Sequence, residues 1–161
     1  MLIVLLCGGI ASADQVVKYL IRSHLALNAS VPIINGFFNL THVRNPGAAW
    51  GMLGGFNTWL TLLSFVMLVL LIKFRRTFIG GIPANRWALG CMLGGIVGNF
   101  IDRIRLTFIV DFLDFYSGSY HFPSFNIADA AICTGVGLYI LASSLPARAM
   151  SGEVPDSPKS L

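Results

Sequence analysis

The chain has 161 residues, of which 55% are hydrophobic and 11% are charged, and its mean hydropathy is +0.75. A soluble globular domain carries about 25% charged residues, so this composition excludes one and predicts a polytopic membrane protein. The formal net charge of +4 does not indicate nucleic-acid binding, because the basic residues are not interleaved with stacking aromatic residues along a polar face.

Four apolar segments approach the length of about 20 residues that a helix needs to cross a bilayer. They are Met1–Ile21, Trp59–Phe74, Trp87–Ile101 and Ile127–Leu145. Short loops rich in Lys and Arg stay on the cytoplasmic side, and the loop after the second segment holds basic residues and no acid, namely Lys73, Arg75, Arg76 and Arg86. We therefore expect both termini inside and two outer segments, Arg22–Asn57 and Asp102–Asn126.

The two ends of the chain give weaker signals. Residues 1–148 are expected to form one domain, and residues 149–161 a disordered cytoplasmic tail. Ala11-Ser12-Ala13 resembles a signal-peptide cleavage site, but no positive region precedes it and the apolar pattern continues beyond it. Cys7 lies in a lipobox-like context, against which the large Leu6 argues. The lack of basic residues at the start leaves open that the natural start lies upstream of Met1.

Neither the cysteines nor the histidines form a metal or redox motif. Cys7, Cys91 and Cys133 lie far apart in apolar stretches and form no C-x-x-C pair, so we expect inert buried thiols. The histidines are scattered, and neither H-E-x-x-H nor G-x-S-x-G occurs. We therefore expect no metal and no other cofactor.

The first outer segment predicts a small sheet. Phe37–Val43 has strand-forming residues in partial alternation, and Asn45-Pro46-Gly47 is a turn signal. Trp50 and Phe56 suit the headgroup zone of a membrane. We expect the sheet within about residues 22–57, lying on the outer surface.

Polar side chains gather at the outer ends of the predicted helices. A charged group near hydrocarbon is costly, so such residues usually mark a working site. The acids and amides in question all fall at one boundary of the bilayer: Asp14, Asn99, Asp102, Asp111, Asp114, Asn126 and Asp129. Because a transporter more often has its polar site near the midplane, this clustering favours chemistry on a substrate presented at the outer face.

Spacing indicates which of these residues share a helix face. Asp14 and Lys18 are four positions apart with the acid first, which is the favourable order for an ion pair. Asn99, Asp102 and Arg103 share another face, where Arg103 can bind an acid or a substrate carbonyl or phosphate; the alternative is a solvated helix end. The G-x-x-x-G spacing over residues 94–98 favours close helix packing.

Composition alone does not choose between Asp111 and Asp114, because both acids have apolar neighbours. Asn126 can cap the last helix, and Asp129 follows one turn later on the same face. A purely structural Asp129 would gain from the helix dipole. An acid among so many apolar residues costs more than that gain, which favours a functional role.

Together these motifs resemble those of the lipoprotein signal peptidases, also called type II signal peptidases. The resemblance runs from Asp14 to about Leu145 and rests on five pieces: Asp14 with Lys18; Asn45-Pro46-Gly47-Ala48-Ala49-Trp50; Gly98-Asn99-Phe100-Ile101-Asp102-Arg103; Val110-Asp111-Phe112; and Phe125-Asn126-Ile127-Ala128-Asp129. Each piece is weak alone, but the five in this order are specific. Trp50 stands where phenylalanine is more usual in the family.

The resemblance implies a mainly α membrane protein with four transmembrane helices, a small extracytoplasmic β-sheet and a short lid helix, expected within about residues 104–125. It implies an aspartic endopeptidase of the bacterial inner membrane that cleaves prolipoproteins on the N-terminal side of a diacylglyceryl-modified cysteine, at the extracytoplasmic face. On this basis Asp111 and Asp129 are the catalytic pair. The implied substrate-binding or supporting residues are Asp14, Lys18, Asn45, Gly47, Ala48, Asn99, Asp102, Arg103, Asn126 and Ala128.

We expect the pair to share one proton near neutral pH, because two adjacent carboxyls do not both ionise cheaply. One would activate a water and the other would polarise the scissile carbonyl. The expected partners are the lipid-modified precursor and membrane lipids, with no nucleic acid and no obligate protein partner, and Leu113–Pro123 is expected to close over the cleft. The alternatives are a small proton-coupled transporter and a non-catalytic membrane scaffold.

Overall fold

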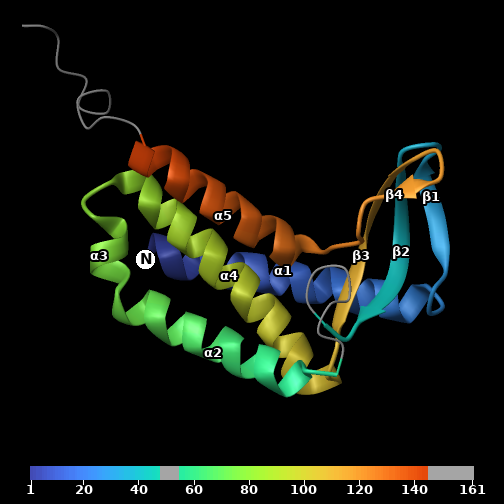
Figure 1. Ribbon diagram of the computed structural model, residues 1–161, viewed down its shortest axis with the longest axis horizontal. Helices are drawn as coiled ribbons and strands as arrows, with labels where there is room; N and C mark the ends of the chain where they lie inside the picture. Colours follow the sequence, from blue (N-terminus) through green and yellow to red (C-terminus); the bar gives the residue numbers. More distant parts are fainter. Residues whose placement is uncertain (48–54, 145–161) are drawn as a thin grey trace, which may run out of the picture.

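The computed structural model describes residues 1–47 and 55–144, in which a helical bundle carries a small sheet at one end (Figure 1). The helices are α1 (Leu2–His24), α2 (Asn57–Lys73), α3 (Arg75–Ile79), α4 (Pro83–Leu106) and α5 (Ile127–Ser144). The strands are β1 (Ser30–Ile34), β2 (Phe38–Asn45), β3 (Ile109–Ser117) and β4 (Tyr120–His121). The sheet lies where α1 and α4 end and where α2 and α5 begin.

The four apolar segments expected from the sequence correspond to α1, α2, α4 and α5. Helix α4 continues five residues beyond the expected end at Ile101, so Asp102 and Arg103 lie inside its last turns. Within the described residues, α1 and α5 are long and apolar enough to cross a membrane, and α2 is apolar but shorter. Leu145, the expected end of the last segment, lies outside the described residues.

Helix α1 turns polar side chains inward and large apolar ones outward. Its buried residues are Ala11, Asp14, Lys18 and Ile21, which recur every three or four positions and so lie on one face. On other faces, Val16 is 57% exposed. A soluble protein has the reverse arrangement, so this helix suits apolar surroundings such as a membrane.

Glycines let α4 pack closely against both α1 and α5. A Cβ added at Gly98 would lie 2.7 Å from Asp14 Oδ2 and 3.2 Å from the Cβ of Ala128. A Cβ at Gly95 would overlap the carbonyl oxygen of Ala128. Small residues at these positions therefore bring the polar residues of three helices within hydrogen-bonding distance.

The sheet is antiparallel, with the strand order β1-β2-β3-β4. Strand β2 confirms the strand expected over Phe37–Val43. The second half of the sheet, β3 and β4, was not expected, because it comes from the other outer segment. Ile21 of α1 packs with Val110 and Phe112 of β3 in an apolar core that holds the sheet against the end of α1.

We expected a lid helix within residues 104–125, and this prediction is wrong. Helix α4 continues to Leu106, and residues 107–126 form β3, β4 and their connections without any helix. The run from Ile109 to Tyr116 is rich in aromatic and β-branched residues, which favour a strand when a partner such as β2 is present. The aromatic residues expected to close over the cleft therefore belong largely to a strand hairpin.

The close packing of α4 predicts that Gly98→Ala lowers stability by about 1–3 kcal/mol, because the added methyl overpacks the contact with Asp14 and Ala128. Thermal unfolding in detergent measures the change. Gly137→Ala in α5 is the matched control, since a Cβ there meets nothing within 4 Å. Equal Tm values for the native protein and Gly98→Ala would contradict this packing.

Candidate active site

Two acids from different secondary-structure elements meet at one residue, Asn126, at the sheet end of the bundle. Asp111 lies in β3, and Asp129 lies in the first turn of α5. Asn126 donates from Nδ2 to Asp111 Oδ1 at 2.7 Å, and its backbone N–H donates to Asp129 Oδ2 at 3.3 Å. The structure therefore brings together the two carboxylates that the motifs single out.

The start of α5 fixes the place of Asp129. The backbone N–H of Asp129 donates to Asn126 Oδ1 at 3.0 Å, while the carboxylate of Asp129 accepts the N–H of Asn126. This reciprocal pair satisfies two of the N–H groups that a helix start leaves without partners. The same contacts orient the Asp129 side chain.

Strand geometry separates Asp111 from Asp114. Successive side chains on a strand point to opposite faces, and these acids are three positions apart on β3. Asp114 accepts a hydrogen bond from Asn39 Nδ2 at 3.0 Å and lies 2.8 Å from His121 Nδ1. Asp114 thus belongs to a different group of residues, and only Asp111 lies with Asp129.

Three asparagines turn their NH₂ groups toward the two carboxylates. Asn45, at the end of β2, donates to Asp111 Oδ2 at 3.0 Å, and Asn126 donates to the other oxygen of Asp111. Asn99 of α4 donates to Asp129 Oδ1 at 2.7 Å. The pair is therefore surrounded by neutral donors that stabilise negative charge without supplying a full positive charge.

The oxygen of each of these amides is held by another donor. An asparagine side chain has a donor end and an acceptor end, so a donor on the oxygen decides that the NH₂ faces the carboxylate. The three donors are the backbone N–H of Gly47 for Asn45, the backbone N–H of Asp129 for Asn126, and Lys18 Nζ for Asn99. Gly47 is thereby given a role, whereas Ala48, also expected near the site, lies outside the described residues.

Burial changes the acidity of Asp111, which is 2% exposed. Its removal from water, reinforced by the negative charge of Asp129, raises the pKa of Asp111 to about 7, against the opposing hydrogen bonds from Asn45 and Asn126. A carboxyl with this pKa carries a proton for much of the time at neutral pH. This is the behaviour expected of a pair that shares one proton.

A cavity of about 620 Å³ opens beside the pair. Its polar lining includes Asn45, Asn99, Arg103 and Asp129, and its apolar lining includes Ile96, Phe122, Phe125 and Ile132. Asp111 is not part of the lining, but it accepts a hydrogen bond from Asn45, which is. The cavity therefore offers an apolar space with a carboxylate and a guanidinium at its polar side, which is a common composition for a ligand site.

Arg103 lines the cavity and reaches toward α2. Its Nη1 lies 3.4 Å from Ser64 Oγ, a residue of α2 that sequence reasoning missed. Among residues 1–47 and 55–144, Arg103 forms no ion pair. Its fork of donors therefore faces the cavity with capacity for a carbonyl or an anionic oxygen.

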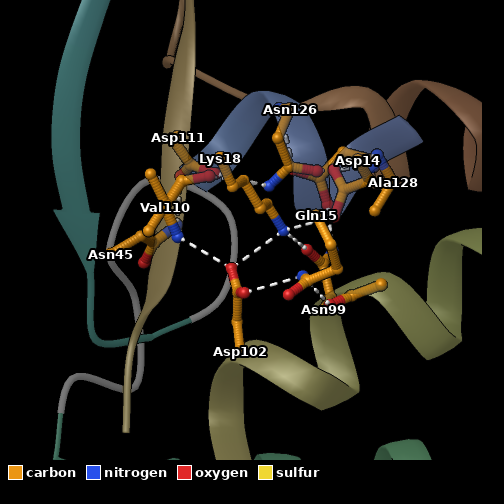
Figure 2. A network of polar contacts seen from close by, with 12 residues as sticks. Asp14, Gln15, Lys18, Asn45, Asn99, Asp102, Val110, Asp111, Asn126 and Ala128 are labelled. Atoms are coloured by element: carbon orange, nitrogen blue, oxygen red, sulfur yellow. Dashed lines mark hydrogen bonds and ion pairs between the residues drawn. The ribbon is translucent and has the colours of Figure 1, made fainter. Parts of the chain in front are cut away.

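A buried ammonium lies beneath the pair, at the centre of Figure 2. Lys18 Nζ is 2.8 Å from Asp14 Oδ2, which confirms the ion pair expected from their spacing, and 2.9 Å from Asp102 Oδ2. Sequence reasoning missed Gln15, which donates to Asp102 Oδ1 at 2.8 Å. The only available signal for Gln15 was its place beside Asp14 on a largely apolar helix.

Comparison with known proteins identifies the family. A model described as signal peptidase (SPase) II matches residues 6–145. This chain belongs to the signal peptidase II family. A lipoprotein signal peptidase of Desulforapulum autotrophicum is 41% identical over 140 residues, which are 81% of this chain and 84% of that protein. The lipoprotein signal peptidase of Shewanella loihica is 43% identical over 88% of this chain and 85% of its own.

Solved structures of similar proteins agree with this fold. One bacterial membrane enzyme superposes with a TM-score of 0.82 at 33% identity, covering 98% of this chain and 94% of that chain. A second superposes with a TM-score of 0.80 at 35% identity, covering 88% of this chain and 92% of that chain. The family expected from the motifs is confirmed, as is a mainly helical membrane enzyme with a small antiparallel sheet.

Coupling between the two acids can be measured at Asp111. Asp129→Asn removes the neighbouring negative charge and should lower the pKa of Asp111 from about 7. The carbon-13 shift of the Asp111 carboxyl, followed against pH in the purified protein, reports this change. Asp114→Asn, on the opposite face of β3, is the control and should leave the Asp111 titration in place. An unchanged titration in Asp129→Asn would show that the two carboxyls are not neighbours.

Proposed function

We propose that this protein is an aspartic endopeptidase that removes signal peptides from prolipoproteins, on the N-terminal side of a diacylglyceryl-modified cysteine. The observation that carries the proposal is the pair of carboxylates, Asp111 and Asp129, sharing Asn126 beside an apolar cavity. Membership of the signal peptidase II family and relatives named lipoprotein signal peptidases support the substrate class.

The environments of the two acids suggest different roles. Asp129 lines the cavity, so it can act as the general base that takes a proton from an attacking water. Asp111 is buried, and its pKa of about 7 suits it to hold the shared proton and donate a hydrogen bond to the scissile carbonyl. The oxygen of that water bonds to the carbonyl carbon to give a tetrahedral intermediate, whose oxyanion accepts the hydrogen bond from Asp111. When this intermediate collapses, the carbonyl re-forms, the C–N bond breaks and the proton taken by Asp129 passes to the leaving amine.

The lining of the cavity suits a lipid-modified peptide. Its apolar walls, which include Ile96 and Ile132, can take acyl chains. Arg103 stands at the polar side, where it can bind an ester or peptide carbonyl through its donors. The diacylglyceryl group would thus hold the adjoining peptide bond beside the acid pair.

We further propose that α1, α2, α4 and α5 span the bacterial inner membrane, with both termini in the cytoplasm. The basic residues Arg75 and Arg76 lie in α3, at the end of the bundle opposite the sheet (Figure 1). Basic loops stay in the cytoplasm, so this arrangement supports an extracytoplasmic sheet and acid pair. The polar groups described above gather at that one end, which gives no support to a transporter with a site at the midplane.

Loss of either acid should abolish the reaction. Asp111→Asn and Asp129→Asn should each reduce kcat by about a thousandfold or more, because neither variant can both activate water and donate a proton. The assay is cleavage of a lipidated precursor peptide by purified protein, with the unlipidated peptide run in parallel and expected to be a poor substrate. Asp114→Asn is the matched control and should keep most of the activity. Native rates in either pair variant would rule out the proposed chemistry.

The pH dependence of kcat should follow the shared proton. If Asp111 must be protonated, kcat falls as pH rises through its pKa, which is about 7 before substrate binds. Rates at saturating lipidated peptide, measured across neutral pH, give the profile. A kcat that does not change between about pH 6 and about pH 9 would contradict the assignment of the proton to Asp111.

A further inference from the structure

Lys18 contacts a neutral amide in addition to two carboxylates. Its ammonium lies 2.8 Å from Asp14 Oδ2 and 2.9 Å from Asp102 Oδ2, and it donates to Asn99 Oδ1 at 2.9 Å. One of the N–H donors of the ammonium goes to the Asn99 oxygen, and the contacts with the two carboxylates are ion pairs. The side chain is 2% exposed, so water does not compete for them. Neutralising the two acids does not explain the contact with the Asn99 amide.

Each of the three groups leads from Lys18 to the acid pair, as Figure 2 shows for the backbone contacts. Asp14 Oδ1 accepts the N–H of Ala128, the residue before Asp129, at 3.0 Å. Asp102 Oδ2 accepts the N–H of Val110, the residue before Asp111, at 3.1 Å.

The third connection is the shortest. Asn99, whose oxygen is held by Lys18, donates its NH₂ directly to Asp129 Oδ1 at 2.7 Å. One side chain of α1 is thus connected to both halves of the pair, which are carried by β3 and α5.

We propose that Lys18 is a positioning residue for peptide cleavage: by holding Asp14, Asp102 and Asn99, it sets where the two catalytic carboxylates stand relative to each other. This inference rests on the proposed roles of Asp111 and Asp129. A displacement of about 1 Å in a reacting group costs about a hundredfold in rate, so small movements of Val110 or Ala128 are enough to matter.

Lys18 also decides the orientation of the Asn99 amide. The other two asparagines at the pair are held by backbone N–H groups, those of Gly47 and Asp129, which a side-chain substitution leaves in place. For Asn99 the holding group is a side chain, so its effect can be removed. Without it, the Asn99 oxygen is free to turn toward Asp129, where it would repel the carboxylate.

The test separates positioning from charge balance. Lys18→Met keeps the length of the side chain but leaves two acids unpaired, so it should lower both Tm and kcat. Asp14→Asn/Lys18→Met removes opposite charges together and should recover much of the Tm, whereas kcat stays reduced by about 10–100-fold with KM nearly unchanged. Lys73→Met, an exposed lysine at the far end of α2, is the control for the substitution itself.

A double variant with native kcat would overturn the proposal, because charge balance alone would then explain Lys18. A second arm begins with Asn99→Ala alone, which keeps the native lysine and so does not depend on the folding of the Lys18 variants. Asn99→Ala should lower kcat with KM nearly unchanged, and adding Asn99→Ala to the double variant should lower kcat by less than it does in the native background. Native kcat in Asn99→Ala, or full additivity of the two changes, also overturns the proposal.

These results are distinguishable from a failure of the acid pair itself. If Asp111→Asn and Asp129→Asn are inactive while the Lys18 and Asn99 variants keep native kcat, only the positioning role is lost. If the two Asn variants cleave at native rates, the proposed function is lost first.

Discussion

The constraint on which the rest of the structure depends is the cost of keeping carboxylates where water is scarce. A buried charge must be paired or hydrogen-bonded, and four acids from different elements meet that need with shared donors. Asp14 and Asp102 use Lys18 and backbone N–H groups, and Asp111 and Asp129 use asparagines. Apolar burial does little to drive helices together in lipid. These contacts and the close packing at the glycines of α4 therefore also fix the positions of α1, α4, α5 and β3 relative to one another.

The kind of donor distinguishes Asp14 and Asp102 from the two acids that we propose are catalytic. Asp14 and Asp102 share the full positive charge of Lys18, which offsets part of their negative charge. Asp111 and Asp129 accept hydrogen bonds from neutral groups, and the nearest guanidinium, that of Arg103, forms no ion pair within the described residues. A buried pair whose direct hydrogen-bond donors are neutral favours keeping one proton, which is what peptide hydrolysis by two carboxyls requires. The sheet contributes to this by burying Asp111 against the end of the bundle.

The sequence indicated the parts of this arrangement that depend on local spacing. Apolar runs located α1, α2, α4 and α5, and the four-residue interval located the pair of Asp14 and Lys18. The predicted end of α4 came too early in the sequence because Asp102 ends the apolar run. The carboxylate of Asp102 forms an ion pair with Lys18 on another helix. The choice of Asp111 over Asp114 came only from the resemblance to a family, since it depends on which face of a strand each side chain occupies.

Contacts between distant segments were not predictable in the same way. Strand β3 needs β2, which lies about 70 residues earlier in the chain, so its own sequence did not distinguish a strand from the expected lid.

The most direct test of the central claim is an experimental structure with a lipidated peptide whose scissile bond is replaced by a hydroxyl-bearing isostere. The account predicts that this hydroxyl lies within hydrogen-bonding distance of both Asp111 and Asp129, with the acyl chains in the adjoining cavity. A hydroxyl bound away from either carboxylate would contradict it.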